Sequence, residues 1–135
     1  MILVDTNVLL DVVTDDPKWA DWSQHQLEAA SLRDRLIINT VIYAELSIRY
    51  ERIEELDEIL GETEIAVVEI PRPALFLAGK VFRDYRRRGG TKSGVLPDFF
   101  IGAHAAVARF PLLTRDATRY RSYYPTAELI APRSS

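Results

Sequence analysis

The chain has 135 residues, of which 47% are hydrophobic and 27% charged, and its formal net charge is -3. This composition is typical of one compact domain and excludes a disordered tail, so we expect a single domain over residues 1–135. The lack of cysteine excludes disulfides and thiolate metal sites and favours a cytoplasmic location. No apolar run reaches the roughly 20 residues of a membrane span, and the net negative charge argues against binding nucleic acid through the overall field.

Short apolar runs alternate with amphipathic segments in the first half of the chain. The first run ends at Asp5, and Asp5, Thr6 or Asn7 can each cap the helix that follows. A later run, RLIINT, is typical of a buried parallel strand. The predicted elements are a strand over 2–4, helices over 8–13 and 19–32, a strand over 35–40, and helices over 40–50 and 52–61, the last ending at Gly61.

The second half continues this alternation, with prolines and glycines marking the boundaries. A proline begins the longest predicted helix and paired glycines end it. The helix after it contains Gly102 and several alanines, which permit close packing. The predicted elements are a strand over 64–70, a helix over 73–90, a loop over 91–96, a helix over 97–110, and strands over 111–116 and 127–132.

Strands that alternate with helices predict a parallel sheet with helices on both faces, because parallel neighbours need crossover connections. In such sheets ligands bind at the carboxyl ends of the strands. Asp5 and Asp116 each end a predicted strand just before a helical turn. Both therefore fall at the edge of the sheet where a ligand is expected.

Four acidic residues are candidates for a functional site. Asp5, Asp98 and Asp116 each lie at the start of a helix, and for any one of them alone an N-cap worth about 1 kcal/mol is the commoner explanation. Glu45 lies three or four residues from apolar side chains of its helix, so its carboxylate falls on or beside the apolar face. A salt bridge to Arg49, one turn further on, explains Glu45 as well as a functional role does.

The four acids carry more weight together than singly. Carboxylates that share one cleft repel each other and raise one another's pKa values unless a divalent cation compensates. Oxygen ligands without cysteine suit hard cations. The pattern therefore predicts Mg2+ or Mn2+ rather than zinc.

Four segments carry a resemblance to a known family: VDTNVLLDV at the start, AEL around Glu45, LPDFFIGAHA around Asp98 and LLTRDATRY around Asp116. In residue type, order and local setting they resemble the PIN-domain ribonucleases, and particularly the VapC toxins of bacterial toxin-antitoxin pairs. The resemblance runs from the first residues to the last predicted strand. It implies a PIN-like three-layer α/β/α fold whose central, mostly parallel sheet has four to five strands.

The resemblance also implies an activity and the residues that perform it. The acidic quartet of the family, which holds one or two Mg2+ or Mn2+ ions that activate water to cleave RNA, matches Asp5, Glu45, Asp98 and Asp116. Its polar supporting positions match Thr6 or Asn7 and Thr114. The implied partners are an RNA substrate, a small VapB-like antitoxin and a second copy in a homodimer, or a larger complex with the antitoxin.

Basic residues gather around the glycine pair that precedes Asp98. They can guide an RNA backbone toward the acidic residues, and a solvated helix end favoured by the helix dipole explains them equally well. Tyrosines 120, 123 and 124 can stack on unpaired bases, although packing near the last strand is the commoner use of such residues. The candidate RNA-binding residues are Arg83, Arg86, Arg87, Arg88 and Lys92.

Several other functions compete with a toxin nuclease. A haloacid-dehalogenase-like phosphatase needs a second acid where this chain has Asn7, and a receiver domain needs a lysine where the late strand ends in Thr-Arg-Asp. These residues therefore argue against both the phosphatase and the receiver domain. A PIN-fold nuclease of RNA processing without a toxin role, and an inactive metal-free binding or regulatory domain, stay open.

Overall fold

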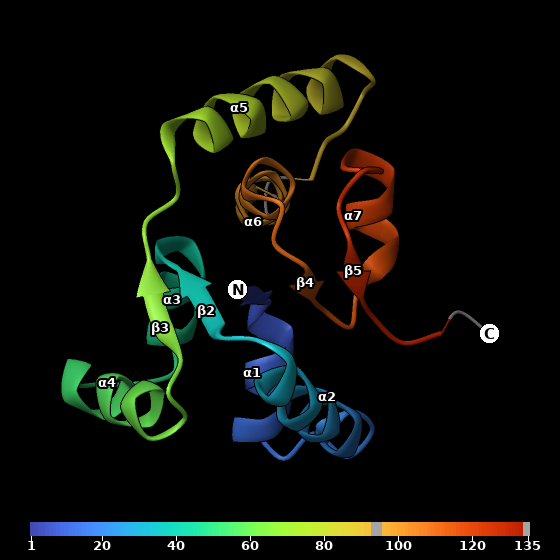
Figure 1. Cartoon of the computed structure of the whole chain (residues 1–135). Coiled ribbons are helices and arrows are strands. Elements are labelled where there is room, and N and C mark those ends of the chain that lie inside the picture. Colours follow the sequence, from blue (N-terminus) through green and yellow to red (C-terminus); the bar gives the residue numbers. More distant parts are fainter. Residues whose placement is uncertain (93–95, 134–135) are drawn as a thin grey trace.

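The structure is a computed structural model that describes residues 1–92 and 96–133. The described residues form five strands and seven helices, whose arrangement is drawn in Figure 1. In chain order they are β1 (Ile2–Val4), α1 (Thr6–Val13), α2 (Ala20–Arg33), β2 (Leu36–Asn39), α3 (Thr40–Ser47), α4 (Ile53–Glu62), β3 (Ala66–Val68), α5 (Arg72–Arg87), α6 (Leu96–Ala108), β4 (Leu112–Leu113), α7 (Ala117–Tyr123) and β5 (Leu129–Ile130).

The five strands make one parallel sheet in the order β3-β2-β1-β4-β5. In Figure 1, α5 and α6 lie above the strands, and α1, α2 and α4 lie below them. The predicted parallel sheet between two layers of helices is confirmed. The chain builds outward from β1 to β3 and then returns to place β4 on the other side of β1. The carboxyl ends of β1 and β4 therefore flank the point where the strand order reverses, which is where such sheets bind ligands.

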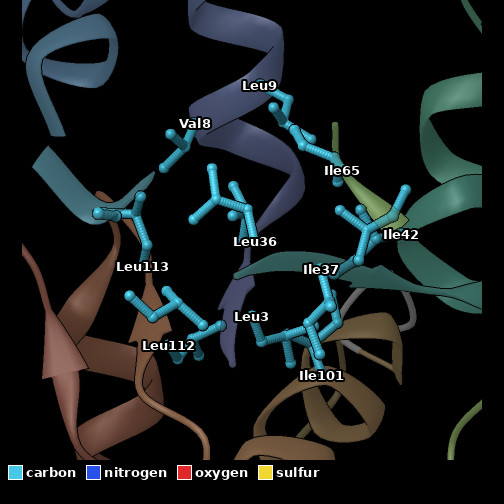
Figure 2. Packing of buried hydrophobic residues seen from close by; sticks show 14 of the residues in the cluster. Leu3, Val8, Leu9, Leu36, Ile37, Ile42, Ile65, Ile101, Leu112 and Leu113 are labelled. Carbon is cyan, nitrogen blue, oxygen red and sulfur yellow. The ribbon is translucent and has the colours of Figure 1, made fainter. Parts of the chain in front are cut away.

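The central strands β1, β2 and β4 are buried in the hydrophobic core of the protein. All three residues of β1 are fully buried, as expected for a central strand covered on both faces. Figure 2 shows Val8 and Leu9 of α1 and Ile101 of α6 approaching the strands from opposite directions. A second apolar cluster forms between α5 and α6 around Phe99. The two clusters fix α1 and α6, the helices that begin beside the carboxyl edge.

Two predicted helix ends are wrong. The helix expected to end at Gly61 continues through Glu62, and the left-handed residue that follows is Glu64, with φ of 56°. The turn closes there because the Ile65 N–H donates to the Leu60 carbonyl at 3.0 Å. The helix expected over 40–50 ends at Ser47 in α3, and only isolated turns follow it.

Other boundaries agree with prediction only in part. Gly89 has the left-handed φ, 87°, after α5, as the glycine pair indicated. The strand expected over 111–116 is limited to Leu112–Leu113, and its last ladder bond runs from the Thr114 N–H to the Ile130 carbonyl. Residues 93–95 of the predicted loop lie outside the described residues. Among the helices that are described, none has the length and apolar character of a membrane span.

Candidate active site

Asp5 lies at the end of β1, where the chain turns into α1. It is the N-cap of α1, and its Oδ1 accepts a hydrogen bond from the Thr6 N–H at 2.8 Å. Its Oδ2 accepts bonds from the Thr114 hydroxyl at 2.8 Å and the Tyr120 hydroxyl at 3.0 Å. The side chain is only 4% exposed. Capping therefore accounts for one carboxylate oxygen, while the other points into a buried polar cluster.

The environment of Asp5 opposes its ionisation. Burial raises the pKa of this carboxyl, and the nearby charge of Glu45 raises it further, whereas hydrogen bonds from Thr114, Tyr120 and Thr6 lower the pKa only in part. Within residues 1–92 and 96–133, no basic side chain forms an ion pair with Asp5. A buried carboxylate with neutral donors alone is a site that a cation would stabilise.

The polar residues after β1 and β4 are joined in one network. The Thr114 hydroxyl donates to Asp5 and accepts from the Asp116 N–H at 3.1 Å. The Asn7 amide lies within hydrogen-bond distance of Asp5 Oδ2, at 3.3 Å, and its oxygen accepts from the Arg115 N–H, also at 3.3 Å. These bonds hold the two strand ends at a fixed spacing. The structure thus brings the predicted supporting residues to Asp5.

Glu45 reaches the same place from α3. It is half-buried, and its Oε1 accepts a hydrogen bond from the Thr6 hydroxyl at 2.6 Å. No ion pair joins Glu45 to Arg49 in the described chain, and Arg49 is exposed. The salt-bridge explanation of Glu45 is therefore wrong in this structure, and the carboxylate is free to face the other acids.

Asp98 and Asp116 complete the acidic cluster. Asp98 lies in the first turn of α6 and forms an ion pair with Arg119. Arg119 Nη2 is also 3.8 Å from Asp116 Oδ2, and the Tyr120 hydroxyl is 3.4 Å from Asp98 Oδ1. Asp116 precedes α7 but makes no side-chain capping bond. Asp116 therefore does not cap α7, and the described partners of Asp98 are Arg119 and Tyr120.

One cavity of about 210 Å³ connects the four acids. It lies at the carboxyl edge, between the end of β1 and the starts of α6 and α7. Its lining comprises Asp5, Thr6, Asn7, Leu10, Glu45, Asp98, Asp116, Arg119 and Tyr120. The acidic quartet predicted from sequence is thus assembled from four distant parts of the chain around a single space.

The donor set of this cavity suits a hard divalent cation, since it offers carboxylate and hydroxyl oxygens and no sulfur. As the side chains stand, no three acidic or histidine residues of the described chain converge closely enough to hold an ion. The Arg119 guanidinium lies between Asp98 and Asp116 and contacts both. In their chemistry, the lining residues fit a divalent cation.

The structure also shows site residues that sequence reasoning missed. Tyr120 was expected to pack or to stack on bases, and it is indeed buried, but its hydroxyl donates to Asp5. Burial and the Asp5 charge raise the pKa of Tyr120 well above its usual value, so the hydroxyl stays a donor. Arg119 and Tyr120 follow Asp116 by three and four residues, and this spacing on a helix was the available signal.

The structure does not place the predicted RNA-binding residues in the acidic cavity. Arg86, Arg87 and Arg88 are exposed at the end of α5, and Arg86 lies over the Phe82 ring at 5.8 Å. The Lys92 N–H donates to the Tyr85 hydroxyl at 3.0 Å, which ties Lys92 to α5. None of these residues lines the acidic cavity. Their role in RNA binding stays a prediction.

The fold and the site define a parallel α/β protein with an acidic centre at the switch point of its sheet. The profile of the PIN domain family matches residues 2–123, and the chain belongs to this family. PIN domains are nucleases, a class of hydrolases, and typically use divalent metal ions. A comparison with curated protein sequences found no match.

Solved structures support the same fold. The chain is similar to VapBC2 from Rickettsia felis, bound to a DNA fragment from its promoter, with a TM-score of 0.74, 19% identity and coverage of 98% of this chain and 100% of the other. For DNA-bound VapBC from Salmonella typhimurium the TM-score is 0.70 and the identity 19%, with coverage of 97% of this chain and 98% of the other. A toxin-antitoxin complex from Klebsiella pneumoniae gives 0.68, 21% and full coverage of both chains. At this identity the likeness concerns the fold.

Proposed function

We propose that this protein is a Mg2+- or Mn2+-dependent endoribonuclease that acts as the toxin of a toxin-antitoxin pair. The observation that carries the nuclease proposal is the cavity at the switch point, where Asp5, Glu45, Asp98 and Asp116 meet. Membership of the PIN family supplies the reaction class. RNA as the substrate and the metal requirement are part of the proposal.

The four carboxylates have distinct places in this proposal. Asp5 is the central ligand, because it is buried, faces the cavity and has no ion-pair partner in the part of the chain that the structure describes. Glu45 approaches from α3, Asp98 from α6 and Asp116 from the start of α7, so the four side chains come from separate parts of the chain. These residues would hold a divalent cation, which would supply the positive charge that activates water and stabilises negative charge on the phosphate. Thr114 and Tyr120 orient Asp5 by donating to one of its oxygens.

RNA cleavage tests the nuclease proposal. Purified protein is incubated with total RNA and Mg2+ or Mn2+, with and without EDTA, beside Asp5→Asn and Asp98→Ala. Asp21→Asn is the matched control, because Asp21 is an exposed acid of α2 away from the cavity. We expect cleavage by wild type and Asp21→Asn only, and only with metal. Cleavage that survives EDTA or the Asp5 substitution would sink the proposal.

The toxin role is supported by a second surface. An apolar groove of about 280 Å³ runs between α1, α2 and α4, with Leu9, Leu27 and Leu56 among its lining residues. Glu28 also lines it, and α4 carries further acids in its first turn. We propose that an antitoxin helix with an apolar face and basic flanks binds here. The structural neighbours are toxin-antitoxin complexes, which favours this occupant.

Growth and binding experiments test this role. Induced expression of wild type should arrest growth, and co-expression of a short protein encoded beside it should relieve the arrest. Asp98→Ala should not arrest growth. Ile59→Lys, on the half-buried rim of the groove, should keep its nuclease activity and lose relief by the antitoxin. Equal growth of wild type and Asp98→Ala would contradict the toxin role and favour a nuclease of RNA processing.

We also propose that the protein forms a homodimer, as toxins of this family usually do, which would place two acidic cavities in one assembly. Light scattering coupled to size exclusion measures the mass directly. A mass of twice 15.4 kDa is expected. A monomer at all concentrations would remove this part of the proposal while leaving the nuclease site intact.

A further inference from the structure

Arg119 is the basic residue among those that line the acidic cavity. Its Nη1 pairs with one oxygen of Asp98, and its Nη2 lies 3.8 Å from Asp116 Oδ2. The guanidinium thus contacts two of the four carboxylates from the same chain. Asp5 and Glu45, which also line the cavity, receive only neutral hydroxyl, amide and backbone donors from the described residues.

We propose that Arg119 is an internal counter-ion that competes with the divalent cation for Asp98 and Asp116, and that full metal binding requires it to withdraw. This inference rests on the proposed metal-dependent function and adds a regulatory residue to the same site. A guanidinium suits the role, because its planar fork can pair with two carboxylates at once and stays charged at every physiological pH.

The two halves of the cavity differ in what a cation must displace. At the Asp5 half, an incoming cation removes no charged partner. At the Asp98 half, it must replace the ion pair with Arg119, so part of the energy gained from the new contacts is offset by the loss of that pair. The apparent metal affinity of the whole site is therefore lower than the four acids alone would give.

Arg119 is placed so that it can leave. Its side chain is 37% exposed, and Asp116, on the outer side, is 49% exposed, so water is available to both groups when they separate. Within residues 1–92 and 96–133, the guanidinium forms a hydrogen bond or an ion pair with these two acids only. A rotation of the long side chain toward solvent frees both carboxylates without unfolding α7.

Calorimetric titration of Mn2+ into the metal-free protein tests this inference without an activity measurement. Arg119→Gln should bind Mn2+ roughly tenfold more tightly than wild type at low salt, a difference of about 1.4 kcal/mol. Arg119→Lys keeps the charge but not the fork, so its affinity should lie between the two. Arg121→Gln is the matched control, since Arg121 is exposed on the same helix and lines no part of the cavity. It should match wild type.

Thermal unfolding in EDTA provides the second readout. Without metal, Arg119→Gln should melt below wild type, because Asp98 and Asp116 lose their counter-ion, and it should gain more in Tm when Mn2+ is added. Equal or weaker Mn2+ binding by Arg119→Gln and Arg119→Lys than by wild type would overturn the inference. Such a result with weaker RNA binding would assign Arg119 to the substrate. If wild type and all variants bind no Mn2+, the proposed metal-dependent function fails as well.

Discussion

Two buried aspartates of similar exposure lie at and within the first helix, and they have opposite surroundings. Asp5 is 4% exposed and Asp11 is 2% exposed. Asp11 Oδ2 accepts from the Ser23 hydroxyl and from the Arg115 Nε, each at 2.8 Å. Asp5 receives neutral donors and faces Glu45. Burial alone therefore does not separate these two aspartates, but their partners do, because Asp11 pairs with Arg115 and Asp5 has no ion-pair partner among the described residues.

The ion pair of Asp11 and Arg115 supports the acidic cavity. Arg115 bonds through its side chain to Asp11 and through its N–H to Asn7, and it lies between Thr114 and Asp116 in sequence. Its guanidinium also lies over the Trp19 ring at 5.7 Å. Asp11 thus anchors the segment that delivers two polar residues to the cavity. Asp11 therefore stabilises the fold through its ion pair, whereas Asp5 is the proposed metal ligand.

The largest effect is expected for activity in Asp5→Asn. Loss of the central carboxylate should lower the rate of RNA cleavage about 1000-fold, the upper range for one preorganised electrostatic group. The folded structure should remain, because the substitution removes a buried charge that has no internal cation. Cleavage rates and circular dichroism measure the two properties. An unfolded Asp5→Asn variant would mean that Asp5, like Asp11, is structural.

The second effect is expected for stability in Asp11→Ala. Breaking a buried ion pair costs several kcal/mol, and because Arg115 is one-third exposed we expect the lower end, about 3 kcal/mol. Urea unfolding in EDTA measures the change. Asp21→Ala, an exposed acid of α2, should change the free energy of unfolding by no more than about 0.5 kcal/mol. A similarly small change in Asp11→Ala would contradict the structural role.

The third prediction concerns the packing that brings Tyr120 to Asp5. A Cβ added at Gly102 would lie 2.4 Å from the Tyr124 ring and 3.0 Å from the Tyr120 ring. Gly102→Ala should therefore cost about 2 kcal/mol, as overpacked cores do, and should also slow cleavage by displacing Tyr120. Gly79→Ala is the control, because Gly79 lies in α5 with open space around it. It should raise stability slightly.

The smallest effect is expected in Ser23→Ala. This substitution removes one fully buried hydroxyl from Asp11 but leaves the pair with Arg115, so we expect a loss of about 1 kcal/mol. Ser31→Ala, whose exposed hydroxyl donates to the Glu28 carbonyl, should change stability less. Cleavage rates should be unaffected in both variants. A large loss of activity in Ser23→Ala would show that the two acids are not separable.

Much of this arrangement could be predicted from the sequence. The parallel sheet followed from the alternation of apolar runs and helical segments, and Asp5 and Asp116 were placed at its carboxyl edge because both end predicted strands. Glu45 was a candidate because a carboxylate on the apolar face of a helix is costly to bury without a partner. These inferences use local patterns and general rules of topology, which a single sequence carries well.

The remaining features depend on tertiary contacts that no local pattern specifies. In the sequence, Arg119 is one of several basic residues after Asp116, and only the fold brings Asp98 into contact with it. Asp11 reads as a polar residue on an amphipathic helix, since its partners lie 12 and 104 residues away. The helix α4 ends one residue later than predicted, at Glu62, and the left-handed residue after it is Glu64 rather than Gly61. Each depends on which distant side chain arrives at a given place.

Direct measurement of Mn2+ binding by wild type, Asp5→Asn and Asp11→Asn tests the central claim that Asp5 binds the metal and Asp11 does not. Asp11→Asn keeps the shape of the side chain and can still accept from Ser23 and Arg115. We expect Mn2+ to bind wild type and Asp11→Asn with similar affinity and Asp5→Asn not at all. Binding to Asp5→Asn as tight as to wild type would contradict the account.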